Sequence, residues 1–354
     1  MKVSIIVPIF NAEPFLHSSV KSVQKQSHKN IEIILVNDAS TDQSLLICKA
    51  LAKSDCRILI VDKTKNEKAL KARVSGLKNA SGDFILFFDA DDYMPVDAVE
   101  KLLSGQKRSD ADITLGALVN YYDRFRLIKS APRNLADGQL ISDDYNEIEI
   151  RDKFSIAFFG LHSIPVTSPA KLFKRDLFIG FSQMDHPAIH AFDDTYLNLI
   201  VFREAKKISF IKDVVYYYRY GGYTSQLDLQ LLPQLNEIHT LRKKILAQKP
   251  IDRAYEYSLI ETKNTIYSFL LNSMLLKDLT FEQFERILLK IKHMGMYAEL
   301  KTFLKNKDFT YSGFYNYVFS DDHEASYQLL LEDFKKVKVR RMTKRFIGKI
   351  LRSL

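Results

Sequence analysis

Residues 83–92 read DFILFFDADD, an uninterrupted apolar run that ends in three carboxylates. Five adjoining apolar residues are typical of a short strand that is buried on both faces. Comparable apolar runs precede it at residues 3–7, 31–36 and 57–61. Segments with apolar residues at helical spacing lie between these runs, at residues 13–26, 42–54 and 67–80. The alternation predicts an α/β fold in which a mostly parallel sheet is covered by helices.

The ends of these strands are the informative positions, because ligands bind beyond the carboxyl ends of parallel strands. Asp38 follows the second apolar run, and Asp89 and Asp91 follow the fourth. Mg²⁺ and Mn²⁺ prefer oxygen ligands and use one or two carboxylates together with substrate phosphates. We therefore expect a cation at this edge, with Arg73 of the preceding helix placed to bind a diphosphate. A solvated acidic turn that caps the next helix is the competing interpretation.

The remainder of the chain is less regular until about residue 227, where helical spacing of apolar residues begins. Strand-like pieces occur at residues 113–122 and 214–220. We expect an α/β domain over residues 1–225, a helical domain over 226–334 and a basic amphipathic tail over 335–354. Within the first domain, Asn66 is the expected N-cap of the helix at 67–80, and Gly82 is its expected stop.

The composition is that of an ordinary globular protein. The chain has 354 residues, of which 46% are hydrophobic and 27% are charged. No apolar run approaches the roughly 20 residues of a membrane span, and no signal peptide is visible after Met1. Cys48 and Cys56 are the only cysteines and are not spaced as a metal or redox pair. These features predict a cytoplasmic protein.

The formal net charge of +9 comes from the C-terminal tail. Residues 335–354 contain nine Lys and Arg and no Asp or Glu, whereas the rest of the chain has 43 basic and 43 acidic residues. A nucleic-acid partner is therefore not expected. Apolar residues recur at helical spacing on the opposite side of the tail, which is typical of a helix that lies on an anionic membrane surface. A helix docked on the protein and a disordered basic end are the alternatives.

Four segments resemble, in order and spacing, the processive and non-processive inverting glycosyltransferases of family 2. They are VSIIVPIFNAEPFL (3–16), IEIILVNDASTD (31–42), KARVSGL (71–77) and GDFILFFDADDYM (82–94). The resemblance covers about residues 3–225 and implies a GT-A fold, followed here by the helical region. It implies a nucleotide-diphosphate sugar as donor, specifically a UDP-sugar, and Mn²⁺ or Mg²⁺ as cofactor. The implied acceptor is a bacterial surface glycan or a lipid-linked glycan, which would place the enzyme at the inner face of the cytoplasmic membrane.

The resemblance also implies roles for individual residues. Asp38 would accept a hydrogen bond from the uracil ring, and Arg73 would lie near the base or the diphosphate. Asp89 would face the ribose or the metal, and Asp91 would be the main metal ligand. The loop that would line the nucleotide contains Pro8, Phe10, Asn11 and Glu13. The other donor-binding positions would be Asn66, Ala90 and Arg219, with Ser225 near the diphosphate.

A later acidic pair of this family contains the catalytic base, and residues 192–197 (FDDTYL) are the best match here. We assign Asp194 as the base and Asp193 as its neighbour. The preceding segment SPAKLF (168–173) resembles the family's Asn-Lys-Leu-Tyr and supports this register. The acceptor hydroxyl is a weak nucleophile, so a base that takes its proton contributes roughly 10²–10⁴-fold to the rate. The expected reaction is direct displacement with inversion and without a covalent intermediate.

Three departures and several alternatives accompany this hypothesis. The family's usual Asn-x-Gly reads Asn66-Glu67-Lys68 here, its Ala-Arg-Asn reads Ala72-Arg73-Val74, and Asp193 stands where Glu is commoner. A non-catalytic sugar-nucleotide or glycan-binding protein of the same fold is the main alternative. A dehalogenase-type phosphatase would carry its acidic motif after the first strand, and a nucleotidylyltransferase would need a glycine-rich, basic first loop. The spacing of His186 and His190 permits zinc binding, but a loop that lines the acceptor site is the favoured interpretation.

Overall fold

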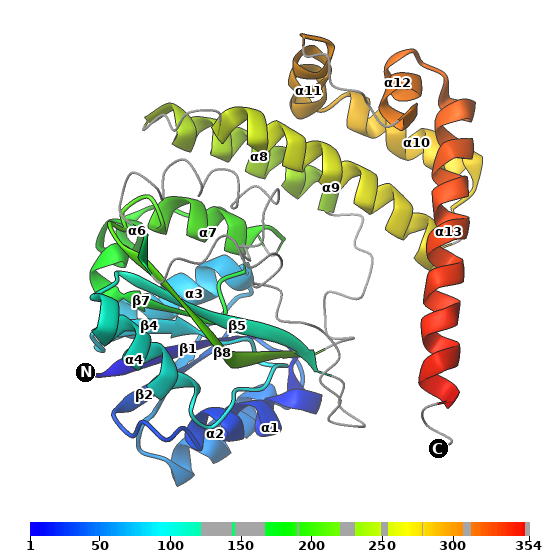
Figure 1. Ribbon diagram of the computed structural model, residues 1–354. Coiled ribbons are helices and arrows are strands. Elements are labelled where there is room, and N and C mark those ends of the chain that lie inside the picture. Colours follow the sequence, from blue (N-terminus) through cyan, green and yellow to red (C-terminus); the bar gives the residue numbers. More distant parts are fainter. Residues whose placement is uncertain are drawn as a thin grey trace. The chain divides into compact units, whose positions relative to one another are not determined.

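The computed structural model describes residues 1–121, 144–145, 167–189, 191–219, 231–248, 254–277, 279–306 and 313–350. The chain forms two compact units (Figure 1). The first comprises residues 1–225 together with 244–254, and the second comprises residues 226–243 and 255–354. The predicted boundary near residue 225 lies outside the described residues. The first unit is an α/β structure, and the second is built from helices.

A single mixed sheet forms the first unit, with eight strands in its described part in the order β3-β2-β1-β4-β7-β5-β8-β6. The strands are β1 (Val3–Ile9), β2 (Ile31–Asn37), β3 (Ile58–Asp62), β4 (Phe84–Phe87), β5 (Ile113–Tyr121), β6 (Asp144–Tyr145), β7 (Lys171–Lys174) and β8 (Ile208–Arg219). The helices are α1 (Glu13–Gln24), α2 (Ser44–Ser54), α3 (Lys68–Asn79), α4 (Ala98–Ser109), the 3₁₀ turn η1 (Arg175–Phe178), α6 (Ile179–Gln183) and α7 (Asp193–Val201).

Strands β1 to β4 pair in parallel and confirm the alternation that the first 92 residues predict. Strand β7 is different, because it runs antiparallel to both β4 and β5. Its four residues begin and end with lysine, so neither its length nor its pattern distinguishes it as a central strand. The pair β5 and β8 is again parallel, and β6 is antiparallel to β8.

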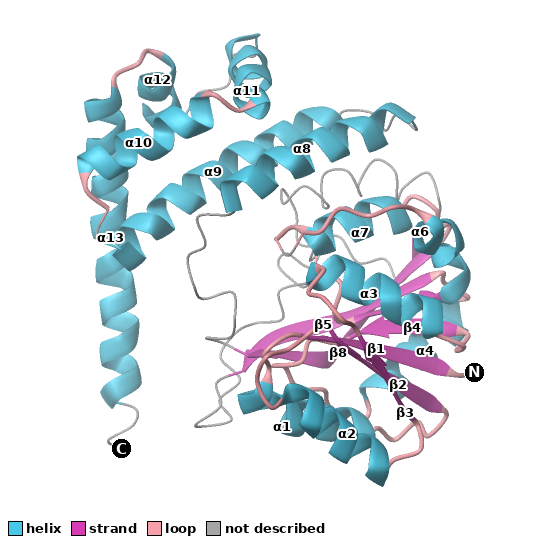
Figure 2. Ribbon diagram, turned by 180° about the vertical axis from the view of Figure 1, so that it is seen from behind, coloured by secondary structure: helices cyan, strands magenta, loops and turns pink. Residues whose placement is uncertain are grey.

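The two faces of the sheet are covered by different helices. Residues of β1 at odd positions, such as Ile5 and Val7, pack in one core with α1, α2 and α4. The opposite face carries α3, where a Cβ added to Gly76 would lie 2.3 Å from the Ile6 side chain. Only glycine allows the helix to approach the strand this closely. Figure 2 shows α3 and α7 on one side of the sheet and α1 and α2 on the other.

The second unit contains six described helices: α8 (Leu231–Gln248, whose last residues belong to the first unit), α9 (Ala254–Lys277), α10 (Phe281–Lys292), α11 (Gly295–Asn306), α12 (Gly313–Phe319) and α13 (His323–Ile350). Thr280 and Gln283 form a capping box that begins α10. A buried ion pair between Arg242 and Glu261 joins α8 to α9. Helix α13 includes residues 335–350 of the basic tail. Within the described ranges, no helix is both long and apolar enough to cross a membrane.

Candidate active site

The loops that follow β1, β2 and β3 emerge side by side. In the register of the sheet, Ile9 lies beside Asn37, and Asn37 lies beside Asp62, so these three strands end at one level. Backbone hydrogen bonds extend the pairing by one step, from Asp38 N–H to the Ile9 carbonyl at 2.8 Å and from Lys63 N–H to the Asn37 carbonyl at 3.0 Å. The sheet thereby places the predicted loop residues along one edge.

The loop after β1 is bound to the loop after β2 through reciprocal hydrogen bonds. The Asn11 carboxamide oxygen accepts from Thr41 N–H at 2.8 Å, and Glu13 accepts from Gln43 N–H at 3.1 Å. In return, Glu13 N–H donates to Asp42 at 3.0 Å. Asn11 adopts a φ of 49°, in the left-handed region that asparagine tolerates better than most residues. Asn11 and Glu13 therefore shape this edge of the site, whatever else they bind.

Two other predicted residues of this loop occupy different environments. Pro8 is part of β1 and pairs with Val36, so its backbone is held by the sheet. Phe10 follows the strand and is exposed. The aromatic ring of Phe10 is thus available at the edge, whereas Pro8 contributes the rigidity of the strand end.

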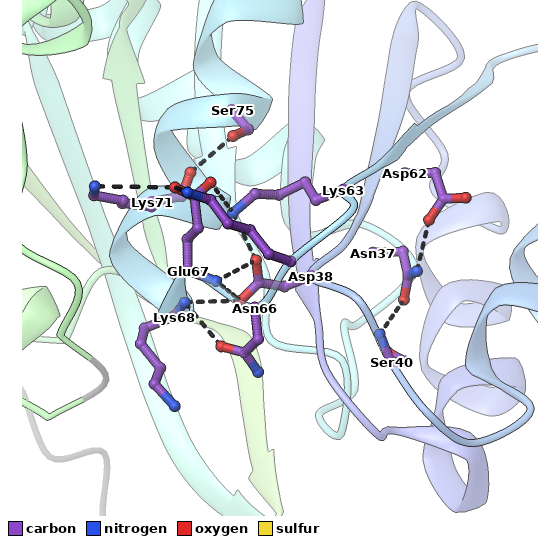
Figure 3. A network of polar contacts seen from close by, with 11 residues as sticks. Asn37, Asp38, Ser40, Asp62, Lys63, Asn66, Glu67, Lys68, Lys71 and Ser75 are labelled. Carbon is purple, nitrogen blue, oxygen red and sulfur yellow. Dashed lines mark hydrogen bonds and ion pairs between the residues drawn. The ribbon is translucent and has the colours of Figure 1, made fainter.

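Asp38 lies at a corner between β2 and the start of α3, and its carboxylate is almost fully engaged (Figure 3). It accepts hydrogen bonds from Lys63 Nζ at 2.6 Å, from Glu67 N–H at 3.0 Å and from Lys68 N–H at 2.8 Å. Only 2% of Asp38 is exposed. These donors include the first free N–H groups of α3, so Asp38 caps this helix from a neighbouring loop.

This arrangement corrects the expected capping of α3. The N-cap is Glu67 and not Asn66, and it makes no side-chain cap of its own. Asn66 accepts a hydrogen bond from Lys68 N–H at 3.1 Å as a secondary contact. Lys68 itself has a φ of 74°, a conformation that favours glycine. The glycine of the family motif thus corresponds to a backbone position that still needs left-handed geometry in this chain.

A buried guanidinium connects the two acidic motifs. Arg73 of α3 is 4% exposed and forms ion pairs with Asp89 at 2.9 Å, with Asp194 at 3.4 Å and with Asp193. Asp89 follows β4, whereas Asp193 and Asp194 begin α7, more than a hundred residues later. The residues predicted from separate motifs therefore lie around one cation.

Burial dominates the protonation of this cluster. Burial raises the pKa of Asp193 to about 7 although Arg73 lowers it, and Asp194 and Asp89 raise it further. Burial likewise raises the pKa of Asp89 to about 6 against the effect of Arg73. For Arg73, burial lowers the pKa, but the three carboxylates more than offset that effect and raise it. Arg73 is therefore always charged, while Asp193 can gain a proton near neutral pH.

Asp89, Asp91 and Asp194 are the more open carboxylates, and 27% of the Asp89 side chain is exposed. Asp194 keeps 24% of its side chain exposed, compared with 11% for Asp193. Among the hydrogen bonds and ion pairs of the described residues, none involves the Asp91 carboxylate, and the residue is partly exposed. A partly exposed, unpaired carboxylate is a hard oxygen ligand that suits Mg²⁺ or Mn²⁺. The described residues contain no group of three or more His, Cys, Asp or Glu that could hold a metal by itself, so phosphate oxygens would complete such a site.

Arg219 lies at the end of β8, close to the acidic turn. Its Nε donates to the Asp91 carbonyl, and its guanidinium lies 4.8 Å from the centre of the Phe15 ring. Ala90, between the two expected metal ligands, is buried. The turn and the end of β8 thus form a single packed element.

The sequence analysis did not identify three residues of this region. Lys63 binds Asp38, and Asp92 and Tyr216 bind each other at 2.5 Å. Lys63 lies two residues after the strand predicted at residues 57–61, a position at a strand end that could have identified it. His186, a candidate zinc ligand, instead hydrogen-bonds the Phe181 carbonyl at 2.7 Å, while His190 lies outside the described residues. Ser225 also lies outside them.

The mixed sheet, with Arg73 joining carboxylates that follow β4 and that begin α7, is the arrangement expected of a GT-A transferase. Residues 4–179 match the family model described as Glycosyl transferase family 2. Glycosyltransferase GlyG of Streptococcus pneumoniae is 30% identical over 220 residues, which is 61% of this chain and 70% of GlyG. The chain therefore belongs to the family 2 glycosyltransferases, as its motifs imply.

Two further comparisons bear on the extent of the similarity. Glycosyltransferase GlyA of S. pneumoniae is 33% identical over 229 residues, which is 62% of this chain but 30% of GlyA. The chain thus spans less than a third of that relative. The crystal structure of S. aureus TarS 1–349 has a TM-score of 0.62 at 20% identity and covers 95% of this chain and 92% of its own. At this identity the match shows the fold, which is GT-A with a helical C-terminal region.

Proposed function

We propose that this glycosyltransferase moves one sugar from a UDP-sugar to a hydroxyl group of a bacterial surface glycan or glycolipid, with Mn²⁺ or Mg²⁺ and with inversion at the anomeric carbon. The observation that carries the proposal is the Arg73 cluster, which joins Asp89 after β4 to Asp193 and Asp194 of α7. The donor class is supported by TarS, a protein of the same fold whose structure in complex with UDP-GlcNAc has a TM-score of 0.60.

The donor would bind along the strand ends. Asp91, together with Asp89, would hold the divalent cation, whose role is to offset the charge of the diphosphate leaving group. Arg219 would lie near the diphosphate, since it borders the acidic turn. Asp38, which holds Lys63 and the start of α3, would shape the pocket of the base from behind, with Phe10 available as a ring surface.

The acceptor hydroxyl would lose its proton to Asp194 while its oxygen attacks the anomeric carbon. Asp194 is suited to this task because it is partly exposed and is held by a cation that stays charged. Asp193 is more buried and serves to fix Arg73. The bond between the sugar and the diphosphate breaks in the same displacement, so the configuration at the anomeric carbon inverts.

Release of UDP from UDP-sugars in the absence of acceptor tests the enzymatic role, because water can replace the acceptor. Wild type should release UDP only with Mn²⁺ or Mg²⁺, and Asp194→Asn should lower this rate by roughly 10²-fold or more while UDP affinity is nearly retained. Asp176→Asn, a change of an exposed carboxylate outside the site, is the matched control. Weakened donor affinity with normal turnover in Asp194→Asn would contradict the assignment, and wild type that binds UDP without turnover would favour the non-catalytic alternative.

The stereochemical part of the proposal has its own measurement. Once an acceptor is found, proton NMR of the product gives the anomeric configuration directly. An inverted configuration is expected. Retention would exclude direct displacement with Asp194 as the base.

We further propose that the basic tail binds an anionic membrane surface at the inner face of the cytoplasmic membrane. Helix α13 runs to Ile350 and carries most of the nine basic residues. Each basic residue near such a surface contributes about 1 kcal/mol. Full-length protein should sediment with phosphatidylglycerol vesicles and not with phosphatidylcholine vesicles. A chain that ends at Asp333 should lose this binding, and equal sedimentation of both chains would refute it.

A further inference from the structure

Asp92, the last carboxylate of the acidic turn, is buried and fully engaged by the end of β8. It is 1% exposed, compared with the partly exposed Asp91 beside it. Its Oδ1 accepts from Arg219 N–H at 2.7 Å, and its Oδ2 accepts from the Tyr216 hydroxyl at 2.5 Å. Both carboxylate oxygen atoms therefore accept hydrogen bonds from the protein, and neither is directed to a bound cation or sugar nucleotide.

Tyr216 extends this connection to the first residue of the turn. Its side chain is fully buried, and its hydroxyl oxygen accepts from Asp89 N–H at 3.1 Å while the hydroxyl donates to Asp92. The ring packs edge-to-face on Phe88, with centroids 5.6 Å apart, which limits its movement. One hydroxyl group thus fixes the positions of Asp89 and Asp92 relative to each other.

Backbone contacts complete the connection on both sides of Asp92. Tyr93 and Tyr217 exchange two hydrogen bonds of 3.1 and 2.9 Å, and Arg219 Nε donates to the Asp91 carbonyl. The turn from Asp89 to Tyr93 is consequently bound at four of its five residues to three of the last four residues of β8. A turn held in this way presents the Asp91 carboxylate in one orientation.

We propose that Asp92 is a positioning residue of the metal site and not a metal ligand: through Tyr216 and Arg219 it holds the turn so that the Asp91 carboxylate faces the cation. The inference rests on the proposed function. Asparagine at position 92 replaces one of the two acceptor oxygen atoms by an NH₂ donor, so that either Arg219 N–H or the Tyr216 hydroxyl loses its buried acceptor and the turn can relax. Metal coordination is sensitive to displacements of about 0.5 Å, so the effect should be seen in metal affinity.

The experiment measures Mn²⁺ affinity by electron paramagnetic resonance in the presence of UDP, together with thermal unfolding. Asp92→Asn should weaken Mn²⁺ binding by about tenfold or more, as is typical when groups that orient a metal ligand are changed. Tyr216→Phe, which removes only the bridging hydroxyl, should weaken it severalfold and provides the test if Asp92→Asn does not fold. UDP affinity without metal should change little in either variant.

Two matched controls separate positioning from general destabilisation. Asp112 accepts hydrogen bonds from Lys206 N–H at 2.7 Å and Lys207 N–H at 3.0 Å, and so fastens the start of β8 as Asp92 fastens its end. Tyr315 is a buried tyrosine of the helical unit that donates to the Lys263 carbonyl at 2.5 Å. Asp112→Asn and Tyr315→Phe should lower thermal stability but leave Mn²⁺ affinity within about twofold of wild type.

The outcomes are distinguishable. If folded Asp92→Asn and Tyr216→Phe bind Mn²⁺ as wild type does, the inference is overturned while the proposed metal site stands. If the control variants lose as much Mn²⁺ affinity, the effect is general destabilisation and the inference is also overturned. If wild type with UDP binds no Mn²⁺, the metal site of the proposed function fails and the inference fails with it.

Discussion

Replacing Arg73 by methionine should destabilise the protein by an amount that grows with pH. Arg73 lies 2.9 Å from Asp89 and 3.4 Å from Asp194 and is 4% exposed. At an effective dielectric constant of 20, each of these contacts corresponds to roughly 5–6 kcal/mol of attraction, which the burial of the charges partly offsets. Removing one partner of such a buried pair typically costs about 3–5 kcal/mol.

The pH dependence follows from proton uptake. Without Arg73, the pKa of Asp193 in the folded state should rise further above its wild-type value of about 7. Between pH 7 and 9 the folded variant then keeps a proton that wild type has lost, whereas the unfolded chains do not differ. Each pH unit in this interval widens the stability gap by about 1.4 kcal/mol, or about 3 kcal/mol in total. The difference between the free energies of unfolding of wild type and variant therefore increases as pH rises.

Urea unfolding in metal-free buffer at pH 7, 8 and 9 measures the gap. Arg57→Met is the matched control, because Arg57 pairs at 2.7 Å with Asp55, whose pKa is lowered to about 2 chiefly by hydrogen bonds from Arg57. Asp55 stays ionised in both states above pH 7, so that variant should lose about 1 kcal/mol at every pH. A gap for Arg73→Met that is constant or narrows between pH 7 and 9 would refute the reasoning.

Two further predictions concern the start of the sheet and the start of α3. Burial would raise the pKa of Glu32, but hydrogen bonds from Lys2, Ser4 and Ser81 hold it at about 2. Glu32→Gln should therefore lower the free energy of unfolding by about 1–2 kcal/mol at pH 6, allowing for solvent screening. Urea unfolding should show that this loss disappears as pH falls from about 4.5 to 2. Lys68 has a φ of 74°, a conformation that glycine adopts without strain. Lys68→Gly should therefore raise the free energy of unfolding by about 0.5–1 kcal/mol. A decrease would show that contacts of the lysine side chain offset the strain of its backbone.

The sequence predicts the part of the fold that depends on local pattern. Runs such as residues 31–36 are too apolar to be half exposed, so they specify buried parallel strands. Once the strands are parallel, their carboxyl ends meet at one edge, and Asp38 and Asp89 are brought to that edge without further information. The convergence of Asp193 with Asp89 on Arg73 follows from the family motif and not from any local pattern.

The contacts that the sequence does not predict all join distant segments. Asp38 caps α3 across about thirty residues, so a rule that considers only the residue before the helix selects Asn66 instead. Strand β7 pairs antiparallel with β4 and β5, although its own sequence begins and ends with lysine and does not mark it as a central strand. Tertiary contacts decide these positions, because the local conformational preferences differ by less free energy than those contacts contribute.

The last two carboxylates of the acidic turn have different tasks, because a carboxylate whose two oxygen atoms hold the turn has none left to bind a cation. Asp89 points to Arg73, and Asp92 points to Tyr216 and Arg219 N–H. In Asp92 these contacts occupy both oxygen atoms, whereas Asp89 gives only its Oδ1 to Arg73 and keeps Oδ2 for a cation. Asp91 has no such partner among the described residues, so it keeps its oxygen atoms for a ligand from solvent. This division suits a metal site that must bind and release a charged product. The neighbouring residues orient the Asp91 carboxylate, and they do not neutralise its charge.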